Sequence, residues 1–273
     1  MGLGRSRGAR WERALVTGAS TGIGRAMAVQ LAAAGVDLVL VARSGDRLEE
    51  LAAELRASGR QLDVEVLEAD LCDPEGLAAV ERRVVAEEAP IDLLVNNAGL
   101  GYEGPFHAQD ASEVWETIGV NVTALVRLTH AALKTMVDSG RGHVVLVSSM
   151  ASLQGMPMTA VYSATKAFIT SFGEAVYEEH KGTGVVVTTA LPGLTRTEFH
   201  ERGRWNLDKW PSVGWQDADE VATETLAAAA RSRPEVVTGR TNRVLAALSG
   251  ISPRHMRRTL IGRVARRAWP EGS

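Results

Sequence analysis

Two short stretches of the chain place a tyrosine four residues before a lysine. They are YSATK at residues 162–166 and YEEHK at residues 177–181. In a helix this spacing puts a phenol and an ammonium on one face, one turn apart. A nearby positive charge lowers the pKa of a phenol, so such a pair can exchange a proton with a substrate. Either pair is therefore a candidate acid–base catalyst.

The magnitude of this effect is sufficient for catalysis at neutral pH. Bringing a phenol from a pKa near 10 to about 7 requires roughly 4 kcal/mol. One ammonium at about 4 Å, in an effective dielectric near 20, contributes on the order of 4 kcal/mol. The sequence thus predicts that a lysine alone can activate the tyrosine that precedes it.

The surrounding elements alternate between short β-rich apolar runs and longer helical patterns. This alternation predicts one α/β domain, a doubly wound Rossmann-like fold with a parallel sheet of about seven strands and helices on both faces. The expected strands are residues 13–17, 36–42, 62–69, 91–96, 143–149, 184–191 and 235–239.

This architecture separates the two tyrosines. Ligands of a doubly wound sheet bind beyond the carboxyl ends of the strands, where the following helices begin. Tyr162 starts the helix after the fifth strand, whereas Tyr177 lies about 22 Å further along the axis. We therefore expect Tyr162 in the site. Tyr177 belongs to a solvated helix end, with Lys181 near the C-terminal dipole and Gly182 as the cap.

A glycine-rich segment, TGASTGIGRA, follows the first expected strand and opens a helix. Gly18, Gly22 and Gly24 would let the backbone turn sharply and approach a pyrophosphate, which the helix N-terminus favours electrostatically. The alternative is a glycine-rich turn that only packs. Within a βαβ unit, this placement predicts a dinucleotide site.

The second strand ends in VARS, where an NAD-specific site would present a carboxylate to the ribose 2′-hydroxyl. Arg43 stands there instead, and a guanidinium can grip a 2′-phosphate, so the expected cofactor is NADP(H). An ordinary solvated arginine is the alternative. Asp70, after the third strand, is placed either to reach the adenine or to serve as an N-cap or turn residue.

Together these residues resemble the short-chain dehydrogenase/reductase (SDR) family over roughly residues 11–240. TGASTGIG is similar to the family's cofactor loop, NNAG (96–99) to its fourth-strand signature and PG (192–193) to the turn after its sixth strand. Thr21 and Thr195 depart from the family pattern. The resemblance implies a catalytic set of Asn121, Ser149, Tyr162 and Lys166. It also implies a cofactor set of Gly18, Ser20, Gly22, Ile23, Gly24, Arg43, Asp70, Asn97, Ala98, Gly99, Tyr162, Lys166, Pro192, Gly193, Thr195 and Thr197.

By this resemblance, the reaction is hydride transfer between the nicotinamide and a carbonyl carbon. Tyr162 would give or take the proton, Lys166 would tune it and bind the nicotinamide ribose, and Ser149 would orient the substrate oxygen. Asn121 would hold a water against Lys166, or would simply bind nearby backbone. The alternatives are a non-catalytic NADP-binding regulator or scaffold and a nucleotide-sugar epimerase or dehydratase. Too little chain follows residue 194 for the large substrate domain of the latter.

An aromatic segment at residues 194–216 is expected to form a lid over an apolar and fairly bulky carbonyl or alcohol substrate. The alternative places its tryptophans at a subunit interface. The expected lid residues are Leu194, Phe199, Trp205, Trp210 and Trp215, over a floor of Met150, Leu153, Met156 and Met158.

Residues 1–11 are expected to form an N-terminal extension, residues 12–240 the domain, and residues 241–273 a basic helical extension. The last of these carries six arginines between Arg254 and Arg267 and an apolar stripe of Met256, Leu260, Val264 and Ala268, with Ile261 beside it and Trp269 near its end. Such a helix, with Ser252 as its N-cap and Pro253 in its first turn, docks on protein or makes a peripheral contact with an anionic membrane.

The composition limits the partners, the metal sites and the cellular location that we expect for the protein. A net charge of −3 gives no reason to expect a nucleic-acid partner, and the six histidines show no metal-ligand spacing. The single cysteine, Cys72, and an N-terminus without an apolar signal core predict a cytoplasmic protein. No run is long and apolar enough for a membrane span. The family resemblance implies a homodimer or homotetramer.

Overall fold

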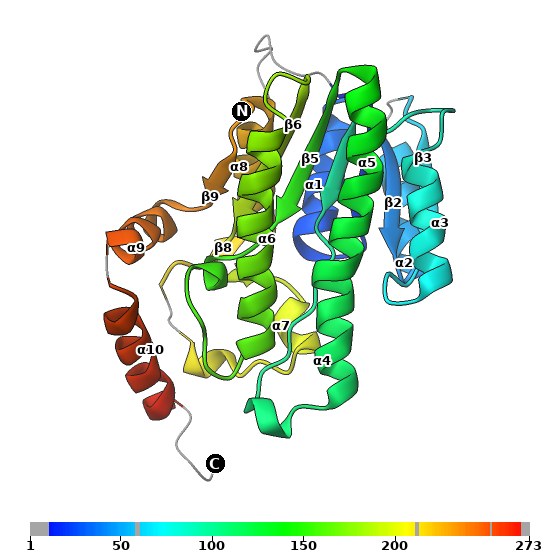
Figure 1. Ribbon diagram of the computed structural model, residues 1–273. Coiled ribbons are helices and arrows are strands. Elements are labelled where there is room, and N and C mark those ends of the chain that lie inside the picture. The colour runs from blue at the N-terminus through cyan, green and yellow to red at the C-terminus, as the bar shows by residue number, and fades with distance from the viewer. Residues whose placement is uncertain (1–10, 58–60, 211–212, 252, 269–273) are drawn as a thin grey trace.

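Seven strands form one parallel sheet in the order β3-β2-β1-β4-β5-β6-β9, so the predicted doubly wound fold is confirmed. The sheet belongs to a computed structural model that describes residues 11–57, 61–210, 213–251 and 253–268 (Figure 1). The strand order reverses between β1 and β4, and doubly wound folds bind ligands at this switch point. The strands are β1 Arg13–Thr17, β2 Asp37–Ala42, β3 Val64–Glu68, β4 Leu93–Asn96, β5 Gly142–Val147, β6 Val185–Leu191 and β9 Glu235–Val237.

The strands are apolar on both faces because helices cover both. Val16 packs with α1 (Gly22–Ala33), α2 (Gly45–Arg56) and α8 (Ala218–Ala230). Its neighbour Leu15 packs with α3 (Pro74–Val84), α5 (Leu125–Ser139) and α6 (Ala160–Glu179) on the other face. This alternation is the two-residue period of a strand. Paired positions share a face, since Leu15 lies opposite Val39 and Leu94.

Between β4 and α5 the chain runs through η1 (Phe106–Ala108), α4 (Ala111–Ile118) and a π-helical turn, η2 (Gly119–Ala124). The helix α4 begins at Ala111, because the carboxylate of Asp110 accepts a hydrogen bond from the backbone of Ser112. The expected fifth strand is two residues shorter at its end than predicted. It stops at Val147, and Ser149 instead caps the short helix η3 (Met150–Leu153).

The expected lid contains more regular structure than its sequence predicts. It includes a two-stranded pair, β7 (Thr195–Arg196) with β8 (Gln216–Asp217), and the short helices α7 (Phe199–Arg202) and η4 (Leu207–Lys209). Two further helices, α9 (Arg240–Ile251) and α10 (Arg254–Ala268), follow β9. Figure 1 shows them descending past the carboxyl ends of the strands, toward the side where α7 lies.

Some sequence predictions concern residues outside the described part of the chain. They include most of the N-terminal extension (residues 1–10), the expected cap Ser252 and the aromatic Trp269. Within the described ranges, no helix combines the length and apolarity needed to cross a bilayer.

Candidate active site

The loop between β1 and α1 has the shape that a pyrophosphate requires. Gly18 and Gly22 have φ angles of +66° and +54°, a left-handed region that glycine adopts without strain. A Cβ on Gly24 would lie 2.3 Å from the carbonyl oxygen of Gly18, so only glycine lets α1 begin this close to the loop. The N-terminus of α1 therefore faces the groove that the loop lines, and the residues fit an anionic ligand there.

Thr17 fastens this loop to β4, a role that the sequence analysis missed. Its Oγ1 accepts hydrogen bonds from the backbone N–H groups of Asn97 and Ala98, both at 3.0 Å, and donates to the carbonyl of Val95. The amide of Asn97 donates in return to the carbonyl of Thr17 at 2.9 Å. The sequence did contain a signal for this role, a threonine at the end of a buried strand, because a buried hydroxyl needs hydrogen-bond partners.

Arg43 lies at the rim of the same groove and is paired rather than simply solvated. Its Nη1 donates to Oε1 of Glu116 at 2.9 Å and lies 3.9 Å from Oδ2 of Asp70. Glu116 also accepts a hydrogen bond from the phenol of Tyr102 at 2.7 Å. A phosphate at Arg43 would therefore compete with carboxylates for the guanidinium.

Asp70 has the turn role that the sequence left open. Its Oδ1 accepts a hydrogen bond from the backbone of Cys72 at 2.8 Å, and the N-cap of α3 is Asp73. Asp70 nevertheless lines the groove beside Arg43. The two expectations for this residue are thus compatible.

The four expected catalytic residues come together at the carboxyl ends of β4 and β5. Lys166 Nζ lies 5.7 Å from the centre of the Tyr162 ring and donates to the carbonyl of Val147 at 2.8 Å. Asn121 and Lys166 both approach Gly99. A Cβ placed on Gly99 would lie 3.4 Å from Asn121 Oδ1 and 3.4 Å from Lys166 Nζ. Ser149, Tyr162 and Lys166 line one cavity, whereas Asn121 lies behind it and is fully buried.

The side chain of Asn121 forms hydrogen bonds with nearby backbone groups, which is one of the two roles expected for it. Its Nδ2 donates to the carbonyl of Leu100 at 2.8 Å and to Thr165 Oγ1 at 3.0 Å, while its Oδ1 accepts from the N–H of Leu100 at 2.8 Å. Asn121 lies in the π-helical turn η2, and such turns are frequent at functional sites. The water relay toward Lys166 stays a prediction.

Burial governs the titration of Tyr162 and Lys166. It raises the pKa of the Tyr162 phenol to about 12, against a lowering interaction with the Ser149 hydroxyl. It lowers the pKa of the Lys166 ammonium to about 8. The predicted lowering of the Tyr162 pKa by Lys166 is therefore wrong for the protein alone, because desolvation of the phenol dominates and the ammonium is directed at Val147.

Tyr177 lies near the opposite end of α6 and does not line the cavity. It is less solvated than expected, since it packs against the apolar cluster beneath α3, α5 and α6. Lys181 follows the end of the helix, with its Nζ 5.3 Å from the Tyr177 ring and an ion pair to Glu178. The YEEHK stretch thus lies at the C-terminal end of α6, and its tyrosine does not line the cavity.

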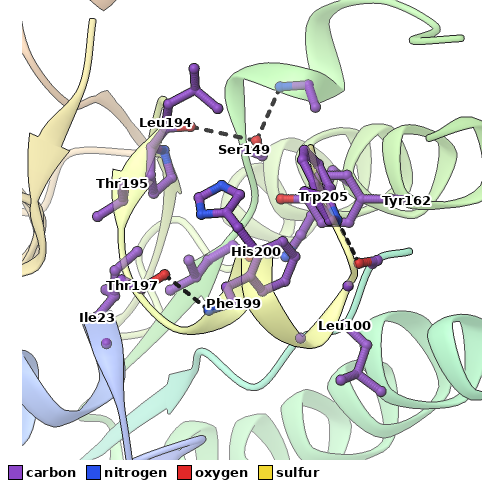
Figure 2. Close-up of a pocket in the computed structure, with 18 of the residues that line it drawn as sticks. Ile23, Leu100, Ser149, Tyr162, Leu194, Thr195, Thr197, Phe199, His200 and Trp205 are labelled. Atoms are coloured by element: carbon purple, nitrogen blue, oxygen red, sulfur yellow. Dashed lines mark hydrogen bonds between the residues drawn. The ribbon is translucent and has the colours of Figure 1, made fainter. Parts of the chain in front are cut away.

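Aromatic side chains of the lid cover Tyr162 (Figure 2). The ring centroids of Phe199 and Trp205 each lie 5.5 Å from that of Tyr162. Trp205 stacks on Trp210 at 4.9 Å, and its Nε1 donates to the carbonyl of Gly101 at 2.8 Å. Both tryptophans thus pack within the chain. Trp215 lies further out against His200 and does not line the main cavity.

The expected floor is correct in three of its four members. Met150, Leu153 and Met156 line the cavity, but Met158 does not. Met158 has a φ of +69°, and its carbonyl accepts a hydrogen bond from Gly104 at 2.8 Å. Its role is therefore to hold the loop before α4.

The cavity has a volume of about 1270 Å³ and runs from the glycine loop to the C-terminal helices. Leu245 and Leu248 of α9 and Ile261 and Ala265 of α10 line its far end. The expected apolar stripe of α10 is wrong at Met256, which is 57% exposed, because the helix presents Ile261 and Ala265 to the cavity instead. Residues of α9 and α10 thus help to line the cavity.

The remaining residues of the expected cofactor set line the same cavity as the glycine loop and Arg43. They are Ser20, Ile23, Asn97, Ala98, Gly99, Pro192, Gly193, Thr195 and Thr197. Thr197 reaches the glycine loop, since a Cβ on Gly22 would lie 2.9 Å from its Cγ2. In the described part of the chain, no group of histidine, cysteine and acidic residues could hold a metal ion.

Comparison with known proteins agrees with this geometry. A family model described as short chain dehydrogenase matches residues 12–207. The chain is 31% identical over 208 residues to the human very-long-chain 3-oxoacyl-CoA reductase, covering 72% of this chain and 64% of that protein. It therefore spans about two thirds of the length of that relative.

Two solved structures are also similar. One is a short-chain dehydrogenase from Sphingobium yanoikuyae in complex with NADPH, at 37% identity and a TM-score of 0.80, covering 92% of this chain and 95% of that one. The other is the bulky-bulky ketone specific alcohol dehydrogenase from Comamonas testosteroni, at 31% identity and a TM-score of 0.75, covering 88% and 93%. The chain belongs to the short-chain dehydrogenase/reductase family of oxidoreductases, which act on CH–OH and C=O groups.

Proposed function

We propose that the protein is an NADP(H)-dependent oxidoreductase that interconverts a ketone and a secondary alcohol on an apolar, bulky substrate. The observation that carries this proposal is the placement of Ser149 and Tyr162 in a cavity of about 1270 Å³ with an aromatic and aliphatic wall. Pockets for a single small ligand measure roughly 300–1,000 Å³. The volume therefore suits a dinucleotide together with a sizeable substrate.

The residues of the groove fit the cofactor that the Sphingobium relative binds. The glycine loop would hold the pyrophosphate, Arg43 the 2′-phosphate, and the segments 97–99 and 192–197 the nicotinamide half. When bound, this cofactor supplies or accepts the hydride. Lys166 would hold the nicotinamide ribose from the floor of the site.

The protein's own residues move the proton and orient the substrate. Ser149 is placed to donate a hydrogen bond to the substrate oxygen, and Tyr162 to exchange a proton with it. With a pKa of about 12, the phenol stays protonated at neutral pH. A protonated phenol can donate its proton to the substrate oxygen as a ketone is reduced.

The substrate preference rests on the wall of the cavity. Phe199, Trp205, Trp210, Met150 and Met156 all line the cavity, and the Comamonas relative is named for bulky ketones. A regulator or scaffold would not need all four catalytic side chains. In the described chain, the residues after β6 form a lid and helices around the cavity, which disfavours an epimerase or dehydratase.

Consumption of NADPH by the purified protein tests the proposal. We expect turnover of long-chain and bicyclic ketones and little turnover of a polar aldose. Efficient aldose reduction without ketone reduction would refute it. Assembly as a homodimer or homotetramer stays a prediction, which analytical ultracentrifugation can check, and so does membrane contact through α10.

A further inference from the structure

An ion pair joins two walls of the groove that the glycine loop lines. Arg47, in the first turn of α2, lies 2.7 Å from Glu198, the residue before α7, measured between Nη1 and Oε2. Both side chains line the cavity, and they are 48% and 45% exposed. A side chain that lines a cavity and is half exposed lies at its opening. The pair therefore stands at the solvent edge of the groove.

The position of Glu198 brings this pair next to the glycine loop. Its neighbour Thr197 meets the loop, since a Cβ on Gly22 would lie 2.9 Å from Thr197 Cγ2. Figure 2 shows Thr197 beside Ile23, at the start of α1. Arg47 comes from α2, the helix that follows the residue expected at the 2′-phosphate. The ion pair thus connects the segment expected at the 2′-phosphate with the segment that meets the glycine loop.

The connection depends on one arginine. Among the described residues, Glu198 is the one ion-pair partner of Arg47, and the second partner of Glu198 is Arg202, at 3.7 Å. Arg202 lies on α7, so it holds Glu198 within its own segment and does not reach α2. Exposed ion pairs are individually weak. The contact between Arg47 and Glu198 can therefore open to pass a ligand and close again.

We propose that the Arg47–Glu198 pair is a latch that closes over the bound cofactor and sets how fast NADP(H) enters and leaves the groove. Both are positioning residues, since in the closed latch they hold each other rather than the cofactor. The pair forms between protein groups alone, so it slows association as well as dissociation. This inference rests on the proposed function, because it concerns the groove for the same dinucleotide.

A direct contact between Arg47 and a phosphate is the alternative role, and the two roles predict opposite effects of Glu198→Gln. Loss of the carboxylate frees Arg47 and removes a negative charge near the cofactor. A direct contact would then become stronger, and NADPH would leave more slowly. A latch would instead lose one of its two halves, and NADPH would both bind and leave faster. The sign of the change in the dissociation rate constant therefore separates the two roles.

Stopped-flow fluorescence measures this rate constant when excess NADP⁺ displaces bound NADPH, without substrate or turnover. In Glu198→Gln, we expect the association and dissociation rate constants each to rise by about 2- to 5-fold, the effect of one exposed ion pair. Arg47→Gln with Glu198→Gln removes the latch without changing the net charge, and it should show the same rise. The matched control is Glu201→Gln, which makes the same charge change on an exposed residue of α7 outside the cavity lining.

The possible outcomes distinguish the latch from the proposed function. Unchanged or slower release in Glu198→Gln, or wild-type rates in the double variant, would overturn the latch. An equal rise in Glu201→Gln would also overturn it, because the effect would then not depend on the pair. If the wild type binds no NADPH, the proposed cofactor is wrong and the latch is wrong with it. Faster exchange in both latch variants without ketone turnover would support the latch while refuting the proposed function.

Discussion

The indole of Trp205 meets the ring of Tyr162 edge-on, with 5.5 Å between the ring centroids and 89° between the ring planes. The main chain closes the site around the same ring, since a Cβ on Gly101 would lie 2.5 Å from its Cδ2. Trp205 is itself tied to Gly101 by a hydrogen bond of 2.8 Å. The lid and the loop after β4 thus enclose the phenol together, which accounts for its raised pKa.

Loss of the Trp205 ring should weaken substrate binding. Because the indole covers the cavity above Tyr162, Trp205→Ala is expected to raise the KM for 4-nonanone by roughly 10-fold, the effect of about 1.4 kcal/mol of lost apolar contact. The matched control is Trp115→Ala, since Trp115 is 69% exposed on α4. Steady-state kinetics of both variants checks this, and an equal effect of the two substitutions would count against the lid.

Arg43 should select the phosphorylated cofactor. Loss of a charge-assisted phosphate contact costs roughly 1.5–3 kcal/mol. The wild type should therefore prefer NADPH to NADH by at least about tenfold in kcat/KM, and Arg43→Asp should invert the preference.

Glu116 provides the complementary variant. Its carboxylate holds the Arg43 guanidinium at 2.9 Å and competes with a phosphate for it. Glu116→Gln should therefore tighten NADPH binding while leaving NADH binding unchanged, which fluorescence titration of both nucleotides can measure. Equal use of NADPH and NADH by the wild type would contradict the role of Arg43.

The sequence predicted the fold and the candidate site well where the evidence is local. Glycines in a strand–helix turn, alternating apolar runs and the Ser149–Tyr162–Lys166 spacing each depend on a few adjacent residues. Thr17 was missed because its partners, Asn97 and Ala98, are about 80 positions away in the chain. Such a contact follows only from the pairing of β1 with β4.

Burial was the second source of error. The lysine that should activate Tyr162 was placed correctly, but the desolvation of the phenol depends on Phe199 and Trp205 of the lid, which pack against its ring. The contribution of α10 to the cavity was likewise hidden, because a helical stripe does not indicate what it packs against. Ile261 and Ala265 face the site while Met256 faces solvent.

His143 should make the fold sensitive to acid. It is 1% exposed, and burial lowers its pKa to about 4 from an ordinary 6.5. Thr188 Oγ1 donates to the carbonyl of Arg233, so it accepts from Nε2 of the neutral ring, 3.1 Å away. As the pH falls from 6.5 toward 4, the unfolded chain takes up a proton that the folded chain excludes, and stability is lost.

This loss is on the order of 3 kcal/mol in the free energy of unfolding. His143→Gln keeps a donor for Thr188 but cannot titrate, so its stability should fall less over this window. Urea unfolding at pH 4 and pH 7 gives the change in the free energy of unfolding for the wild type and for His143→Gln. Subtracting one change from the other removes the contribution of the carboxylates, which the two proteins share. Parallel pH profiles would show that His143 does not titrate as described.

Contact with an anionic membrane is testable through exposed arginines of α10. Arg258 and Arg263 are exposed, and each basic residue near such a surface contributes about 1 kcal/mol. Arg258→Glu with Arg263→Glu should abolish binding to phosphatidylserine vesicles at low salt. The control pair Arg231→Glu with Arg233→Glu makes the same charge change on exposed residues after α8 and should bind normally. Wild-type protein that ignores the vesicles would leave docking on protein as the role of α10.

The central claim is that Tyr162, and not Tyr177, exchanges the proton. The most direct measurement is kcat for ketone reduction by Tyr162→Phe and Tyr177→Phe, with NADPH binding measured in parallel. Because a positioned acid contributes roughly 10²–10⁴-fold, Tyr162→Phe should lower kcat by at least about 100-fold with nearly unchanged NADPH affinity. Tyr177→Phe should stay within a few fold of the wild type. Near-normal kcat in Tyr162→Phe, or a larger loss in Tyr177→Phe, would contradict the account.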